Sequence, residues 1–221
     1  KLEAVVTDLV TPEKVKAFDI GYRGSIEGFS IDVTGYYNIY DDFISQVAVI
    51  TPINGSAQDG SGVIDIVTGQ TQVFSLYTNS PTQITSYGAS IGVNKRVFEK
   101  LDLGFSYTWT SFEYDQQKYA DFEAGFNTPE HQFKASIGSI NLFEGFGFNV
   151  NYRFANDFLW ESTIANAVVP STSIFDAQIN YSVPKIKSLF KVGGTNIGGD
   201  AYMVAPGTGY VGSMYYISWV I

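Results

Sequence analysis

The only histidine of this 221-residue chain, His131, lies directly after Pro129 and Glu130. A serine hydrolase would need a serine and an acid or amide brought to that imidazole, and the sequence carries no nucleophile elbow or related signature. A single histidine in a chain without cysteine also lacks the donors of a transition-metal site. We therefore predict that the chain is not an enzyme and has no catalytic residue, metal site or cofactor.

A glycine-rich segment at 59–65 reads D-G-S-G-V-I-D and loosely resembles a calcium-binding loop. It lacks the regular ligand spacing of such loops and the glutamate that closes them. We interpret it as the tip of a surface loop, where glycine and serine favour turns.

Aromatic side chains in the predicted loops are candidates for ligand binding. Exposed rings offer a large contact area at little entropic cost, which suits a ring-bearing molecule or a sugar. Packing of the loops on themselves would explain the same rings. The candidate rings are Tyr114, Tyr119, Phe122, Phe158 and Trp160.

The elements that must position these residues are strands, because apolar residues recur at every second position. Residues 146–155 read F-G-F-N-V-N-Y-R-F-A, and residues 212–221 read G-S-M-Y-Y-I-S-W-V-I. We count about nine such segments, of the roughly ten-residue length that a tilted strand needs to cross hydrocarbon. The others are 18–23, 29–39, 87–93, 101–109, 133–137, 175–181 and 190–192. The pattern predicts an all-β fold, a transmembrane antiparallel β-barrel.

Composition narrows the class of protein. The chain is 16% aromatic and 16% charged, with a net charge of -9 and no basic stripe, so nucleic acid is not a predicted partner. No apolar run reaches about 18 residues, so no transmembrane helix is predicted. The strands of a soluble β-sandwich would also alternate apolar and polar residues. The polar positions here are mostly Gly, Ser, Thr and Asn, however, which suits the lumen of a barrel.

The connections between the predicted strands alternate in length. Short ones are expected at 26–28, 95–100, 139–145 and 184–188, and the longest runs from Ile50 to Thr82. Outer-membrane barrels have short turns on the periplasmic side and long loops outside. Acidic residues gather in the long connections, which indicates a solvated rim or attraction of cations.

Three polar side chains of the predicted strands face the lumen and are candidates for lining a substrate path. They are Asp32, Tyr36 and Arg153. Asp32 and Arg153 would also be explained by ion pairs within the wall.

Three stretches of the sequence resemble segments of one known family. Residues 9–24 read L-V-T-P-E-K-V-K-A-F-D-I-G-Y-R-G, and residues 127–131 read N-T-P-E-H. Residues 169–187 read V-P-S-T-S-I-F-D-A-Q-I-N-Y-S-V-P-K-I-K, followed by G-G-T-N and then Y-Y-I-S-W. In order and spacing they are similar to the late barrel of TonB-dependent outer-membrane receptors, especially Bacteroidota-type members.

This resemblance implies that residues 1–221 are the C-terminal part of a barrel of about 22 strands, without its plug domain and earlier strands. It implies TonB-dependent uptake of a large scarce nutrient, of the siderophore, cobalamin or glycan type, across the outer membrane of a Gram-negative bacterium. The implied partners are TonB, through a region upstream of this chain, the nutrient cargo, outer-membrane lipid and lipopolysaccharide, and envelope proteins. A docking subunit of an envelope complex and a passive porin are the alternatives.

Overall fold

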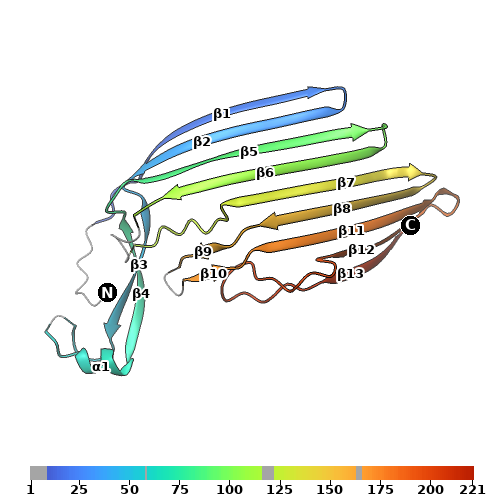
Figure 1. Ribbon diagram of the computed structural model, residues 1–221. Coiled ribbons are helices and arrows are strands. Elements are labelled where there is room, and N and C mark those ends of the chain that lie inside the picture. Colours follow the sequence, from blue (N-terminus) through green and yellow to red (C-terminus); the bar gives the residue numbers. More distant parts are fainter. Residues whose placement is uncertain (1–8, 58, 116–121, 163–165) are drawn as a thin grey trace.

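The computed structural model describes residues 9–57, 59–115, 122–162 and 166–221. Its main element is one antiparallel sheet of nine strands, which lie side by side in chain order (Figure 1). This confirms the all-β fold and the nine strands predicted from the period-two pattern. The strands are β1 (Lys14–Ile26), β2 (Phe29–Asp41), β5 (Ile84–Val97), β6 (Leu101–Glu113), β7 (His131–Phe143), β8 (Phe146–Ala155), β11 (Thr172–Val183), β12 (Ser188–Thr195) and β13 (Met214–Val220).

The pairing register separates apolar and polar side chains onto opposite faces of the sheet. Val150 of β8 lies opposite Ile137 of β7 and Ala177 of β11, whereas the next residue, Asn151, lies opposite Asp176. Because side chains alternate along a strand and neighbouring strands share one register, the alternation of each strand extends across the sheet. The sheet therefore has one continuous apolar face and one polar face.

The two ends of the sheet differ in their connections, as predicted. Strands β1 and β2 are joined by Glu27 and Gly28, and β7 and β8 by Glu144 and Gly145, all with positive φ angles. Two-residue hairpin turns of this kind match the twist of the strands and favour glycine at the second position. The long connections leave from the opposite end, and the C-terminus lies at the short-turn end (Figure 1).

The long connection after β2 contains structure that the sequence reasoning missed. A hairpin of β3 (Ile44–Pro52) and β4 (Thr71–Asn79) extends from the long-loop end, with the short helix α1 (Val63–Thr68) between its strands (Figure 1). A second, smaller hairpin pairs β9 (Phe158–Trp160) with β10 (Ala167–Val169). The 3₁₀ helix η1 (Pro184–Ile186) follows β11, and no described helix is long and apolar enough to cross a membrane.

The predicted turn at 139–145 is wrong over its first five residues, which belong to a strand. Strand β7 continues to Phe143, which pairs with Phe146, and its register shifts between Ser139 and Phe143. An irregularity of this kind interrupts the alternation of side chains, so the period-two pattern ends before the strand does. The turn itself is only Glu144 and Gly145.

The sheet curves around its polar face. A hollow of about 720 Å³ lies on that face at the short-turn end, and its lining runs from Ser30 of β2 to Lys191 of β12. Residues on strands six places apart in the sheet line one hollow only because the sheet is strongly curved. Among the described residues, β1 and β13 do not pair with each other. The chain thus forms an open part of a barrel wall, with the polar face inside.

Candidate functional site

The inner wall is crossed by ion pairs between neighbouring strands. Three ion pairs on the polar face each join an arginine to an aspartate across one strand boundary. The pairs are Arg23 with Asp32 at 2.5 Å, Arg96 with Asp102 at 2.6 Å, and Arg153 with Asp176 at 2.8 Å. Two of the residues predicted to line a substrate path, Asp32 and Arg153, are thus engaged by other wall residues.

Tyr36, the third predicted wall residue, lies nearer the long-loop end. It lines a hollow of about 250 Å³ together with Phe112, Phe126 and Glu130. Gly88 lies opposite Tyr36, and a Cβ atom at Gly88 would come within 3.0 Å of the Tyr36 hydroxyl. The missing side chain at Gly88 therefore makes room for the ring to lie against the wall.

An apolar cluster, which we call the mouth cluster, lies at the long-loop end of the inner wall. Ile84 is fully buried, and Phe122, from the connection between β6 and β7, is 4% exposed. Ile84 of β5 pairs with Tyr40 of β2 on the inner face, so the cluster lies inside the curve of the sheet. The mouth cluster consists of Ile84, Phe122 and Ala124, with Tyr40, Phe43, Val47, Phe112 and Tyr114 packed against them.

This position bears on Phe122, one of the predicted ligand contacts. Phe122 is enclosed by the mouth cluster, so its ring packs the loops instead of presenting a surface. Tyr114 is half-buried, with its ring 5.4 Å from that of Phe122. Phe158 and Trp160 lie on β9 as half-buried rings 6.4 Å apart. Tyr119 lies outside the described residues.

Hydrogen bonds join the connections at the mouth into one assembly. Asn127, before β7, donates to the carbonyl of Glu161 at 3.1 Å and accepts from its N–H at 2.7 Å. The N–H of Gly125 donates to the Glu161 carboxylate at 3.1 Å. On the other side, the Ser45 hydroxyl of β3 donates to the carbonyl of Glu123. The β3–β4 hairpin, the 122–130 segment and the β9–β10 hairpin are therefore linked.

Glu123 lies at the centre of these links. Its Oε1 accepts a hydrogen bond from Asn166 at 3.1 Å, whereas its Oε2 is buried and has no hydrogen-bond partner among the described residues. Burial is the largest influence and raises the pKa of Glu123; the Asn166 bond opposes this, and the negative charge of Glu161 adds to it. An ionised carboxylate in such surroundings costs free energy, because its charge is poorly solvated.

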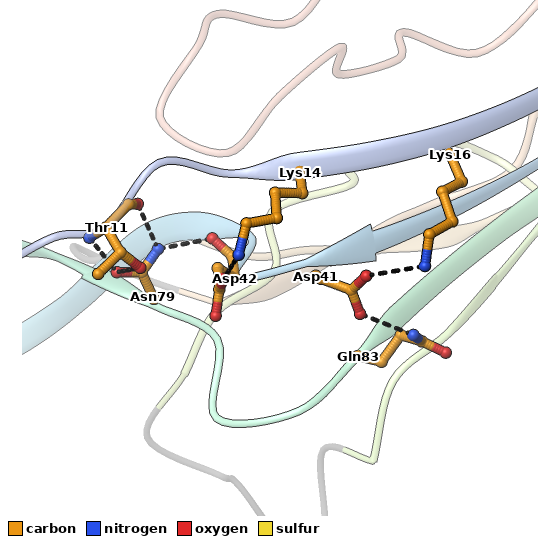
Figure 2. Close-up of polar contacts among 7 residues, drawn as sticks. All are labelled: Thr11, Lys14, Lys16, Asp41, Asp42, Asn79 and Gln83. Carbon is orange, nitrogen blue, oxygen red and sulfur yellow. Dashed lines mark hydrogen bonds and ion pairs between the residues drawn. The ribbon is translucent and has the colours of Figure 1, made fainter.

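Figure 2 shows how the root of the β3–β4 hairpin is held. Asn79, at the end of β4, accepts from the N–H of Thr11 at 2.7 Å. Its Nδ2 donates to the carbonyl of Thr11 at 2.9 Å and to that of Asp42 at 2.6 Å. Lys14 pairs with the Asp42 carboxylate at 3.1 Å. One amide side chain thus joins both ends of the hairpin to the segment before β1.

The adjoining residues strengthen this root. Asp41 accepts from Lys16 at 3.4 Å and from Gln83 at 2.7 Å (Figure 2). Glu13 accepts the N–H of Ile44, the first residue of β3, at 3.0 Å. The T-P-E motif that carries part of the family resemblance therefore supplies contacts that fix the hairpin. No local pattern in the sequence indicates the partners on the hairpin itself.

The aspartates of the 59–65 segment also have structural partners. Asp59 accepts from the hydroxyl and the N–H of Ser61, and these bonds lower the pKa of Asp59. Asp65, in α1, accepts from the backbone and side chain of Asn54. The described residues contain no group of three or more acidic, histidine or cysteine side chains placed to hold a metal ion.

Three residues that hold the mouth together were not predicted from the sequence. Phe126 was not predicted, yet its ring stacks on Phe112 at 3.7 Å and lines the hollow below Tyr36. The available signal was its aromatic character just before the N-T-P-E-H motif. Glu123 and Asn127, which tie the loops together, are ordinary polar loop residues and had no such signal.

Comparison with known proteins identifies the relatives of this fold. The family model for the "TonB dependent receptor-like, beta-barrel" matches residues 5–197. The FrpB iron transporter from Neisseria meningitidis has a TM-score of 0.64 at 14% identity, with 97% of this chain and 31% of that chain covered. The ferric yersiniabactin uptake receptor FyuA from Yersinia pestis gives 0.63 at 10% identity, with 93% and 28% covered.

A third structure, FpvA from P. aeruginosa bound to a heterologous pyoverdine, has a TM-score of 0.66 at 9% identity, with 96% of this chain and 27% of that chain covered. The chain thus spans less than a third of each of these structures. No curated protein matches the sequence. The structural likeness, at such low identity, establishes the fold, and the family model extends over most of the sequence. The chain therefore belongs to the TonB-dependent receptor-like β-barrel family.

Proposed function

We propose that this chain is the C-terminal part of the barrel wall of a TonB-dependent transporter in the outer membrane of a Gram-negative bacterium. The observation that carries the proposal is the nine-stranded sheet, with an apolar face, a polar face on the inside of its curve, and its long loops at one end. In a membrane the apolar face contacts lipid and the polar face lines the lumen. The Bacteroidota-type sequence resemblance supports the same assignment.

Transport by such a protein needs parts that lie outside this chain. We expect an upstream plug domain, further strands and a segment that TonB binds, so that energy from the inner membrane moves the plug. The cargo is a large scarce nutrient of the siderophore, cobalamin or glycan type. The FrpB iron transporter and the ferric yersiniabactin receptor make a ferric siderophore the first cargo to test.

The mouth is where cargo would first contact this part of the wall. Tyr36, Tyr114, Phe158 and Trp160 are half-buried and retain exposed ring surface, so they are the proposed contacts, together with Tyr119. Asp32 and Arg153 lie deeper on the wall, and their ion pairs would have to rearrange before either could bind cargo. Lipopolysaccharide, outer-membrane lipid and envelope proteins are the proposed surroundings.

The experiment is a growth comparison on limiting ferric siderophore, cobalamin and complex glycan. Strains would lack the gene that encodes this chain, lack TonB, or lack both. A transporter predicts that one nutrient supports growth only when both genes are present, with no further loss in the double mutant. Growth that depends on the gene but not on TonB would indicate a porin. No growth defect, together with loss of a co-purifying envelope protein, would indicate a docking subunit.

A further inference from the structure

A third hollow, of about 320 Å³, lies at the long-loop end, away from the mouth cluster. One wall is Ser171 with the start of β11, including Thr172. The other is the connection between β12 and β13, including Asp200, Tyr202 and Tyr210. Its volume is at the lower end of the range for small-molecule sites, about 300–1,000 Å³. No proposed transport contact belongs to this hollow.

The connection that forms the second wall is anchored by one asparagine. Asn196 is 2% exposed, its N–H donates to Asp176 at 3.0 Å, and its Nδ2 donates to the carbonyl of Asp200 at 2.9 Å. Its own carbonyl accepts from the hydroxyl of Ser213. The backbone and side chain of this one buried residue together bond to the sheet and to both ends of the connection, and so fix the start of the wall relative to the sheet.

The tip of the same connection is also ordered by its sequence. Residues 205–208 read A-P-G-T, with Gly207 at a φ of +79° and the N–H of Thr208 donating to the carbonyl of Ala205 at 3.1 Å. Proline followed by glycine is the sequence preference of a type II turn. Tyr202 and Val211 exchange two backbone hydrogen bonds across its base. Tyr202 and Tyr210 are therefore held close together before any ligand arrives.

The lining has a distinct chemistry. Tyr210 is 72% exposed, and Tyr202 is half-buried, so both offer ring surface. Asp200 has no ion-pair partner among the described residues, and the hydroxyls of Ser171 and Thr172 lie at the opposite wall. The lining contains no lysine, arginine or histidine. Such a site disfavours anions, and it combines flat apolar surfaces with hydrogen-bond acceptors.

We propose that this hollow binds a saccharide ring. One face of a pyranose ring is a patch of C–H groups that packs on an aromatic ring, and its hydroxyls donate to carboxylate and hydroxyl oxygens. The preformed walls reduce the entropic cost of binding. The sugar comes from a soluble glycan or from the saccharide part of lipopolysaccharide. Binding at this site does not require that the chain transports the sugar.

The test uses the full receptor that contains this chain, purified in detergent. Two probes are titrated by calorimetry: a mixture of neutral oligosaccharides, and the core oligosaccharide released from the organism's own lipopolysaccharide. The variants are Tyr210→Ala and Asp200→Asn, which preserves the shape of its side chain. The matched control is Tyr77→Ala, an exposed tyrosine on β4 outside the lining of this hollow.

We expect at least one probe to bind with a dissociation constant below about 1 mM, and both site variants to weaken it at least tenfold, with no effect of the control. If the site variants lose binding to the neutral mixture, the sugar comes from a soluble glycan. If they lose binding to the core oligosaccharide, it comes from lipopolysaccharide. No binding of either probe, or equal effects of Tyr210→Ala and Tyr77→Ala, would overturn the proposal. Nutrient uptake, measured separately, reports on transport and not on this site.

Discussion

The nine-stranded wall and the assembly of loops at its mouth obtain their order in different ways. In the wall, the position of a residue in its own strand determines which face it occupies, and the register repeats that choice across the sheet. At the mouth, the surroundings of Phe122 depend on strands and loops that are distant in sequence. Substitutions should therefore act through face and depth in the wall, and through specific partners at the mouth.

The largest effect is expected in the wall. Val150→Arg places a charge on the apolar face near the middle of β8, which should cost about 2–4 kcal/mol if that face meets lipid near the bilayer midplane. The neighbouring Asn151→Arg places the same side chain on the polar face beside Asp176 and should be far milder. The measurement is the denaturant midpoint of the receptor folded in liposomes. Equal losses for the two variants would contradict the assignment of the faces.

At the mouth, Phe122→Ala should loosen the loops without unfolding the wall. Removing the buried ring leaves a cavity, and in a small cluster we expect the loops to lose about 2 kcal/mol of local stability, less than the roughly 3–5 kcal/mol of a large core. Hydrogen exchange should become faster in the 122–130 segment and the β3–β4 hairpin. An unchanged exchange rate there, or a lower midpoint for the whole receptor, would show that wall and mouth are not separate units.

The root of the hairpin offers a smaller test. Asn79→Ala removes the hydrogen bonds to Thr11 and Asp42, worth about 1–2 kcal/mol together because the site is partly solvated. Exchange should quicken throughout β3 and β4. Ser75→Ala, which removes one exposed hydrogen bond to Gln46 on the same hairpin, is the control and should change little. If the two variants behave alike, the root does not fix the hairpin.

The smallest effect concerns pH. Because the folded state raises the pKa of Glu123, the protonated form is favoured, and the loop contacts are most stable below the unfolded pKa of this carboxyl. That stability is lost as the pH rises through the raised pKa. Glu123→Gln should remove this dependence and slow exchange of the 122–130 segment at neutral pH. Glu99→Gln, in an exposed turn at the other end, should leave the dependence intact.

The same contrast explains what could be predicted from the sequence. Val150 and Asn151 were assigned to opposite faces because the alternation of side chains is a property of one strand and can be recognised without knowing which strands pair with it. The hairpin β3–β4 was missed because it lies outside the nine-stranded sheet, and a two-stranded hairpin depends on packing at its root for stability. Asp32 and Arg153 were placed on the correct face, yet their partners, Arg23 and Asp176, follow only from the register.

At the mouth, the sequence identified aromatic residues but not their roles. In the sequence, Phe122 and Tyr114 are both aromatic residues of a predicted loop. Phe122 is the more enclosed of the two because the 122–130 segment packs onto Ile84. The ties through Glu123 and Asn127 come from polar residues that are common in any loop. A contact between two loops has no period, so no pattern within one segment indicates it.

The most direct test of the account is the sidedness of the two ends of the sheet. Single cysteines would be placed at Asp59, on the long connection after β2, and at Lys187, on the short connection after β11, in a receptor otherwise free of cysteine. An impermeant maleimide should label Asp59→Cys on intact cells and Lys187→Cys only after the outer membrane is permeabilised. Labelling of Lys187→Cys but not Asp59→Cys on intact cells would contradict the proposed orientation, and labelling of neither after permeabilisation would contradict the exposure of both ends.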